Sequence, residues 1–190
     1  KTRYTAIQQW FPAGENRAPF YSCIFDPVTS ESCSWIIRKD DTLIFGGCFS
    51  PQDSREAYNR QKSRLEEYLG HSLGRPIKTE ACQAVRPRGF SDFITGRDGV
   101  YLIGEAAGFI SASSFEGISS AIRSGSALAE AMSQADDDRE LARFYRRKTT
   151  SLRLKLWLKT IKRWFMYTPW VRHIIMRLGL AAIHVEQENK

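Results

Sequence analysis

The stretch that decides the fold is "GVYLIGEAAGFISASSFEGISSAIRSG", from Gly99 to Gly125. It begins as a short apolar run after an Asp-Gly turn, reaches a carboxylate at Glu105, and continues through the small residues 106–108. Such a run is typical of a strand that is buried on both faces of a parallel α/β sheet. Ligands bind at the carboxyl ends of strands in such sheets, so we predict a ligand site at Glu105.

A helix is predicted directly after this segment. Ser113 and Glu116 have the spacing of a capping box, which would start a helix at Ser114 that runs to about Met132. The first turn of a helix offers unpaired N–H groups and a partial positive charge. A carboxylate, a gap without large side chains and a helix start together suit a ligand with a polyol arm and an electron-rich ring edge.

At these residues the chain resembles the flavoprotein oxidoreductases of the geranylgeranyl reductase and aromatic hydroxylase type. Their second FAD motif reads roughly Gly-Asp-Ala-Ala-Gly-x-x-x-Pro-x-x-Gly-Glu-Gly-Ile, followed by Ala-x-x-Ser-Gly. The residues that fall on it here are Gly104, Ala106, Ala107, Gly108, Glu116, Gly117, Ile118, Ala121, Ser124 and Gly125. The resemblance implies that Glu105 binds the ribityl chain of FAD and that the loop and helix start face the flavin pyrimidine. The cofactor-binding residues that it implies are Gly104, Glu105, Ala106, Ala107, Gly108, Ser114, Phe115, Glu116, Gly117 and Ile118.

The chain departs from that motif at three positions. Glu105 replaces the family Asp, Ala112 replaces the Pro, and Phe115 replaces the first Gly of Gly-Glu-Gly. The Phe115 ring would crowd the isoalloxazine or stack beside it. The Gly-x-Gly-x-x-Gly that cradles the FAD pyrophosphate in the family does not occur in the 190 residues. We therefore expect the chain to be the C-terminal portion of a longer flavoprotein, whose FAD domain has its N-terminal half elsewhere.

Most of the remaining chain reads as an antiparallel sheet with one helix. Four segments rich in aromatic and β-branched residues predict strands that form a meander: "RYTAIQQWF", "APFYSCIFD", "CSWIIRKDD" and "TLIFGGCF". A helical pattern over residues 54–69 and a strand "IKTEACQAVRP" follow. One face of the sheet would form the wall of a substrate site, with Trp35, Phe45 and Phe49 as pocket residues or, alternatively, as core. Of the Tyr-x-Trp-x-Phe-Pro substrate motif of geranylgeranyl reductases only Trp35 is kept.

These patterns predict an α/β fold class, which is of α+β type within these 190 residues. We expect a substrate-binding sheet region with one helix at 1–95, the second half of a Rossmann-like FAD-binding domain at 96–138, and a basic helical region at 139–190. The last region carries the positive charge, since residues 141–180 hold eleven Lys and Arg and no Asp or Glu, in a chain whose net charge is +7.

The basic region also has an amphipathic pattern. Five apolar residues recur at helical spacing, opposite a cluster of lysines and arginines: Leu154, Trp157, Leu158, Ile161 and Phe165. Pro169 breaks this helix and a second stripe follows. A basic amphipathic helix with aromatic residues on its apolar face can lie on an anionic membrane. The alternatives are a helix packed on the domain with a solvated basic face, or nucleic-acid binding, which we do not expect because no binding fold is recognised.

Other chemistry is not indicated by the sequence. The cysteines at 23, 33, 48 and 82 form no Cys-x-x-Cys pair and suggest buried thiols in a reducing, cytoplasmic compartment. The three histidines are scattered, so no metal site is expected, and no catalytic residue is assigned.

The function expected from the resemblance is that of an FAD-dependent oxidoreductase, of reductase or monooxygenase type, acting on a hydrophobic or isoprenoid-like small molecule. Hydroxylation, halogenation and double-bond reduction all remain open. The protein is expected in the cytoplasm or at the inner face of a membrane. The alternative is a non-catalytic, degenerate flavin-fold module that binds a membrane surface or a protein partner.

Overall fold

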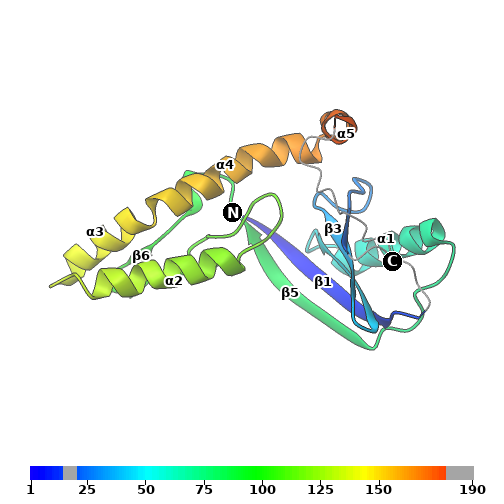
Figure 1. The fold of residues 1–190 in the computed structure, drawn as a ribbon, viewed down its shortest axis with the longest axis horizontal. Helices are drawn as coiled ribbons and strands as arrows, with labels where there is room; N and C mark the ends of the chain where they lie inside the picture. Colours follow the sequence, from blue (N-terminus) through cyan, green and yellow to red (C-terminus); the bar gives the residue numbers. More distant parts are fainter. Residues whose placement is uncertain (15–20, 179–190) are drawn as a thin grey trace, which may run out of the picture.

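A five-stranded antiparallel sheet forms one end of the molecule (Figure 1). The computed structural model describes residues 1–14 and 21–178. The strands are β1 (Thr2–Pro12), β2 (Tyr21–Ile24), β3 (Ser34–Lys39), β4 (Thr42–Phe49) and β5 (Lys78–Arg86), in the order β2-β3-β4-β1-β5. Residues 18–20 of the predicted second strand and residues 179–190 of the basic region, with His184, lie outside the described residues.

The predicted meander is correct for β2, β3 and β4 but wrong for β1. Asp40 and Asp41 form the two-residue turn between β3 and β4. Strand β1 lies between β4 and β5 and pairs with β4 from Thr5↔Phe49 to Pro12↔Thr42. It also pairs with β5, from Thr2↔Arg86 to Trp10↔Lys78. Hydrogen bonds on both edges over most of its length outweigh the sequence proximity of β1 to β2.

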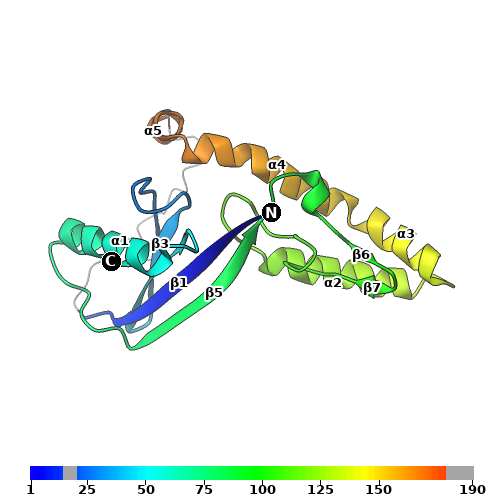
Figure 2. The ribbon, with the colours of Figure 1, turned by 180° about the vertical axis from the view of Figure 1, so that it is seen from behind.

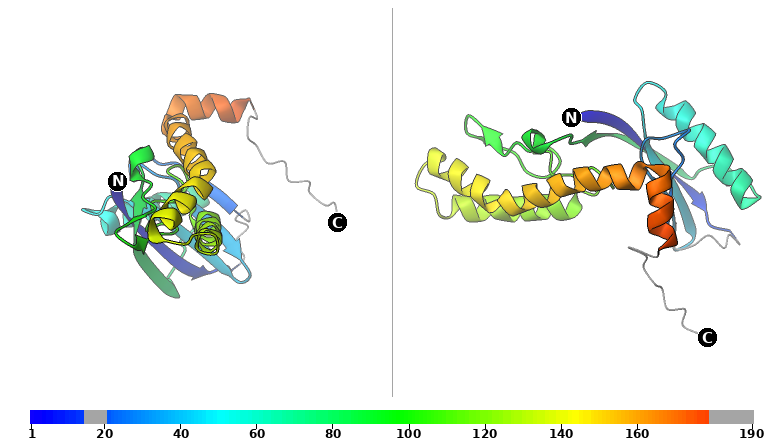
Figure 3. Two further views of the ribbon diagram at one scale, coloured as in Figure 1. Left: turned by 90° about the vertical axis from the view of Figure 1, so that its left-hand side faces the viewer. Right: turned by 90° about the horizontal axis from the view of Figure 1, so that it is seen from above.

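Helix α1 (Ser54–Leu69) covers one face of the sheet (Figures 1 and 3). Its bounds are those predicted, and Gly70 ends it in the left-handed conformation, with φ of +73°. The apolar residues of the two layers form one buried core, whose members are Ile7, Phe11, Ile36, Leu43, Phe45, Phe49, Ala57, Tyr58, Leu65 and Leu73.

The segment after β5 leads away from the sheet into the opposite end of the molecule (Figure 2). It contains a 3-10 turn, η1 (Phe90–Asp92), and the short strands β6 (Gly96–Arg97) and β7 (Val100–Tyr101). The predicted buried parallel strand is wrong here: β7 pairs antiparallel with β6, and Val100 is 63% exposed. Asp98 and Gly99 both have positive φ, which is the geometry of a two-residue hairpin turn.

Four helices complete this end: α2 (Ile118–Met132), α3 (Asp138–Lys148), α4 (Thr150–Tyr167) and α5 (Pro169–Arg177). Helix α2 lies alongside α3, and α4 runs back toward the sheet (Figures 1 and 2). A second core lies beneath α4 and contains Phe93, Ala107, Phe109, Leu152 and Leu156. The predicted break at Pro169 is confirmed: α4 ends at Tyr167, and α5 begins at Pro169 and turns away from the axis of α4 (Figure 3).

Of the apolar stripe predicted on α4, only Trp157 packs against this core. The residues that α4 buries are Leu152, Arg153 and Leu156. Four members of the stripe are between 44% and 53% exposed: Leu154, Leu158, Ile161 and Phe165. In the described part of the chain, no helix has both the length and the hydropathy that a membrane crossing requires.

Candidate functional site

The segment from Gly104 to Phe109 is a tight turn held by its own backbone. The N–H of Phe109 donates to the carbonyl of Gly104 at 2.8 Å, and the N–H of Gly108 donates to the carbonyl of Glu105 at 2.8 Å. Gly104 has φ of +55°, and a Cβ built on it would lie 2.9 Å from the Cβ of Ala121. The glycine is therefore required both by its conformation and by the close approach of α2.

Buried Ser124 of α2 fixes this turn to the helix. Its hydroxyl oxygen accepts the N–H of Gly104 at 2.9 Å, and the hydroxyl donates to the carbonyl of Ala121 at 3.0 Å. The sequence reading placed Ser124 within the motif match without a role, and the structure gives it one. It positions the turn against the second turn of α2.

Glu105 follows the glycine and lies on the surface next to β5. One carboxylate oxygen accepts the N–H of Val85 at 3.1 Å. The other oxygen has no hydrogen bond or ion pair among residues 1–14 and 21–178. The side chain is exposed, as is Ala106 beside it. A ligand hydroxyl could therefore reach this carboxylate without displacing a protein contact.

Helix α2 begins at Ile118, so the predicted start at Ser114 and the predicted capping box are wrong. Gly117 is the N-cap residue and no side chain caps the helix. The Ser113 hydroxyl instead bonds to the Ser111 hydroxyl at 3.1 Å, and Glu116 accepts from the Ser119 hydroxyl at 3.0 Å. The Ser113 side chain is thus used inside the loop, while Glu116 bonds to the first turn of α2 and to Lys159 of α4 at 3.7 Å. The first N–H groups of α2 are left without a side-chain partner.

Phe115 lies in this loop with φ of +56°, a conformation that favours glycine. Its ring contacts Tyr4 edge-to-face, with 5.4 Å between centroids, and lies 4.6 Å from the guanidinium of Arg86. The ring therefore belongs to a cluster at the junction of sheet and loop. The loop is also tied to α4, since the Tyr167 hydroxyl donates to the carbonyl of Ser113 at 2.6 Å and accepts the N–H of Cys33 at 3.1 Å.

The residues predicted to line a substrate pocket lie on the sheet. Phe45 and Phe49 are fully buried in the core under α1, where both contact the ring of Tyr58. Trp35 is half-buried and its indole N–H donates to Gln8 at 2.8 Å. Packing accounts for the burial of the two phenylalanines, and none of these three residues lines the cavities described below. Their role toward a substrate stays a prediction.

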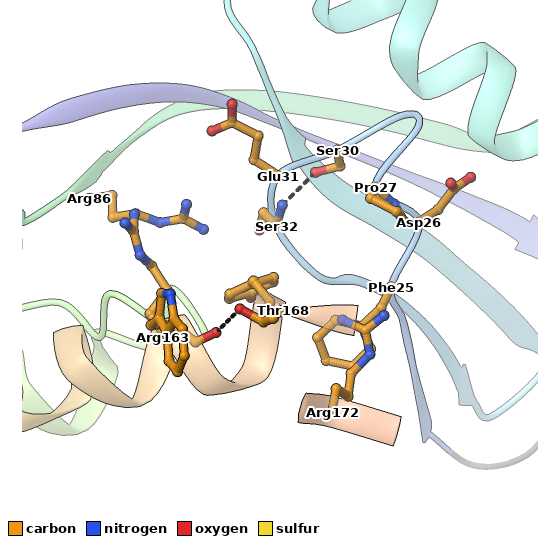
Figure 4. Close-up of a pocket in the computed structure, with 12 residues that line it drawn as sticks. Phe25, Asp26, Pro27, Ser30, Glu31, Ser32, Arg86, Arg163, Thr168 and Arg172 are labelled. Carbon is orange, nitrogen blue, oxygen red and sulfur yellow. Dashed lines mark hydrogen bonds between the residues drawn. The ribbon is translucent and has the colours of Figure 1, made fainter. Parts of the chain in front are cut away.

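Arg86 and Tyr167 were missed by sequence reasoning. Arg86 ends β5 and is only 1% exposed, and it lines a cavity of about 330 Å³ together with Arg163, Arg172 and Tyr167 (Figure 4). Burial raises the pKa of the Tyr167 hydroxyl, so the group stays neutral. The local sequence carried no signal for Arg86, because the aromatic rings around its guanidinium belong to Tyr4, Phe115 and Tyr167, which are distant in the sequence.

The prediction that the cysteines are buried is correct for two of the four. Cys33 and Cys48 are buried, whereas Cys23 and Cys82 are exposed, and all four are free thiols. A hydrogen bond from Cys33 lowers the pKa of Cys23 to about 6, with a further contribution from the Tyr21 hydroxyl. No group of three or more metal-binding side chains occurs among the described residues.

Comparisons with known proteins find curated relatives named CbrA and a solved structure with a similar fold. No family model matches the chain. It is 42% identical over 181 residues to the protein CbrA of Escherichia coli O6:H1, covering 95% of this chain and 48% of that protein. The CbrA protein of Shigella sonnei is 41% identical over 181 residues, with 95% of this chain and 50% of that protein covered. The chain thus spans about half the length of the curated relatives it matches.

A solved structure matches the whole fold. It is a geranylgeranyl bacteriochlorophyll reductase-like protein of Thermoplasma acidophilum, which superimposes with a TM-score of 0.71 at 16% sequence identity. The match covers 97% of this chain and 50% of that protein. The chain has the fold of half of that reductase-like protein. The predicted fold class, with an antiparallel sheet followed by helices, is thereby confirmed.

The residues present fit part of an FAD molecule. A free carboxylate oxygen on Glu105 suits a ribityl hydroxyl, and the uncapped start of α2 suits the ring edge that becomes negative on reduction. Nothing in the described residues fits the pyrophosphate, since the sequence has no glycine-rich phosphate loop. The fit is therefore to the riboflavin portion alone.

Proposed function

We propose that this chain is the C-terminal portion of an FAD-dependent oxidoreductase that acts on a hydrophobic small molecule. The observation that carries the proposal is the free carboxylate oxygen of Glu105, in a turn that Ser124 of α2 holds. The loop after this turn leads to the N-terminus of α2, which no side chain caps. The fold match to a reductase-like protein supports the same assignment.

In this proposal the flavin supplies hydride or electron transfer, and the protein supplies orientation and electrostatics. Glu105 accepts hydrogen bonds from the ribityl arm while its other oxygen remains on Val85. The N–H groups at Gly117 and Ile118 stabilise negative charge on the pyrimidine edge. Ile118 and Ile122 are 79% and 67% exposed on α2, which supports the idea that a further part of the FAD domain covers this face.

The test uses the full-length gene product and its visible flavin absorbance. We expect stoichiometric FAD in the purified protein, and we expect Glu105→Gln to weaken FAD binding about tenfold or more, because a charge-assisted hydrogen bond is lost. Glu67→Gln is the matched control, since Glu67 is an exposed glutamate on α1 far from the turn. Absence of flavin from the wild-type protein would overturn the proposal and favour the non-catalytic module.

A second candidate function is peripheral binding to an anionic membrane through α4. It is supported by the exposed apolar stripe of Leu154, Leu158, Ile161 and Phe165, flanked by Lys155 and Lys162. An apolar face bordered by lysines is the arrangement that binds the interface of anionic bilayers. A hydrophobic substrate would be collected from such a surface, so this function is compatible with the first.

A further inference from the structure

We propose that Arg86, Arg163 and Arg172 form a binding site for a phosphate group. The site is the cavity of about 330 Å³ that lies between the β2–β3 connection, the end of β5 and the junction of α4 with α5 (Figure 4). This site is separate from the residues proposed to hold the flavin, and nothing in the proposal depends on FAD.

The first observation is that the buried guanidinium of Arg86 has free donors. Its Nη1 donates to the Tyr4 hydroxyl at 2.9 Å, while Nε and Nη2 have no hydrogen-bond partner among the described residues. Buried polar groups in native proteins are almost always paired, and an unpaired charged donor is expensive. Two free donors on a residue that is 1% exposed therefore indicate a missing acceptor.

Neighbouring aromatic rings hold this guanidinium in place but do not satisfy it. Its central carbon lies 4.6 Å from the ring centroid of Tyr4, 4.6 Å from Phe115 and 5.6 Å from Tyr167. Cation–π contacts stabilise the charge through the ring faces, whereas N–H donors require an acceptor in the guanidinium plane. The rings thus fix the orientation of Arg86 before any anion binds.

Two further arginines line the same cavity. Arg172 stacks on Phe25 at 4.5 Å and donates to the carbonyl of Met166 at 3.0 Å. Arg163 is half-buried, and its guanidinium makes no hydrogen bond or ion pair to any residue that the structure describes. Figure 4 shows Arg86 and Arg163 on one side of the cavity and Arg172 beside Phe25 on the other.

The carboxylates of the cavity do not neutralise these three charges. Asp26 is bound by Arg64 at 2.7 Å. Glu31 accepts the Tyr4 hydroxyl at 3.0 Å, and the residue is exposed. The acceptors that the guanidinium groups do have are the Tyr4 hydroxyl for Arg86 and the Met166 carbonyl for Arg172, and both acceptors are neutral. The cavity therefore keeps an excess of positive charge.

The chemistry of the donors selects a phosphate. Arginine forks match the paired oxygens of phosphate and carboxylate, and several arginines around one anion match the three terminal oxygens of a phosphate ester. An adjoining cavity of about 700 Å³ shares Phe25, Asp26 and Pro27 with this one and is lined in part by Ile24, Leu65 and Leu69. The phosphate could therefore belong to a water-soluble ester or to the headgroup of an amphiphile.

The experiment measures binding to the full-length protein by isothermal titration calorimetry. The probes are glycerol phosphate and a short-chain phosphatidic acid below its micelle concentration, each compared with its uncharged counterpart, glycerol or the corresponding diacylglycerol. We expect at least one phosphate probe to bind and the uncharged probes not to bind. Binding of both phosphate probes indicates a soluble ester, and binding of phosphatidic acid alone indicates an amphiphile.

Variants locate the binding to this cavity. We expect Arg163→Gln and Arg172→Gln each to weaken binding of the active probe about tenfold or more. Arg55→Gln is the control, because Arg55 is an exposed arginine on α1. Since Arg86 is buried and its loss could unfold the protein, Arg163 and Arg172 carry the test, and thermal unfolding of each variant confirms its fold. Failure of both phosphate probes, or equal affinity in Arg163→Gln, Arg172→Gln and wild type, would overturn the proposal.

Discussion

The guanidinium of Arg86 lies 4.6 Å from the ring centroid of Phe115, and this contact joins the end of β5 to the loop before α2. Phe115 makes the contact from a backbone with φ of +56°, which is unfavourable for any residue with a Cβ. The ring contacts with Arg86 and Tyr4 therefore hold a backbone conformation that glycine would adopt freely.

A pair of substitutions at this position tests the strain. Phe115→Ala and Phe115→Gly both remove the ring, but only glycine relieves the positive φ. We expect the glycine variant to be more stable than the alanine variant by about 1 kcal/mol in the free energy of unfolding, measured by urea denaturation. A more stable alanine variant would show that the residue does not have this conformation.

Gly104 tests the packing of the turn on α2. A Cβ at this position would lie 2.9 Å from that of Ala121, in addition to the positive φ of the backbone. We expect Gly104→Ala to lower the free energy of unfolding by about 2 kcal/mol or more. Gly125→Ala is the control, since its nearest contact would be at 3.9 Å and alanine favours helices. The idea fails if both substitutions have the same effect.

Tyr167 links three parts of the chain through one hydroxyl. Tyr167→Phe leaves the Ser113 carbonyl and the Cys33 N–H without this partner. We expect a loss of about 1–3 kcal/mol in the free energy of unfolding. Tyr68→Phe should have no measurable effect, because Tyr68 is 86% exposed on α1. Equal denaturation midpoints for the two variants would contradict the role of the hydroxyl.

Cys23 should react at unusually low pH. Its pKa is lowered to about 6, chiefly by the hydrogen bond from Cys33, so the thiolate predominates at pH 7 and is lost as the pH falls below about 6. The rate of alkylation by iodoacetamide at Cys23, followed by peptide mass spectrometry, should show this midpoint. We expect Cys33→Ala to move the midpoint upward. An unchanged midpoint in that variant would exclude Cys33 as the cause.

The exposed stripe of α4 should govern any membrane binding. The double variant Leu158→Ser/Ile161→Ser removes two half-exposed apolar side chains without changing the charge. We expect it to reduce co-sedimentation with anionic vesicles several-fold, while neutral vesicles bind neither form. Val28→Ser is the control, as Val28 is 71% exposed but lies near the sheet. Wild-type binding that is independent of anionic lipid would rule out this role.

Local patterns were sufficient for most of the elements. Helix α1 has its predicted bounds because its apolar residues recur at helical spacing and Gly70 stops it. The strands of the sheet and the Asp40-Asp41 turn follow from segments rich in aromatic and β-branched residues that turn residues separate. The small residues 106–108 predicted a gap without large side chains, but nothing in the sequence predicted the hydrogen bond from this turn to Ser124.

The start of α2 could not be predicted from the capping spacing alone. Ser113 and Glu116 had the correct types and separation, but Ser111 of the loop bonds to Ser113, while Ser119 of α2 and Lys159 of α4 bond to Glu116. Similarly, the stripe on α4 has helical periodicity, yet the direction in which a helix faces depends on its neighbours. Leu152 and Leu156 face Phe93 and Phe109, which are distant in the sequence.

By itself the sequence determined the strands of the sheet, the bounds of α1 and which end of the chain is basic, because these depend on interactions between near neighbours. Only the tertiary structure decided that β1 lies between β4 and β5 and that three arginines surround one cavity. Those residues come from segments tens of positions apart, and only long-range pairing and burial bring them together.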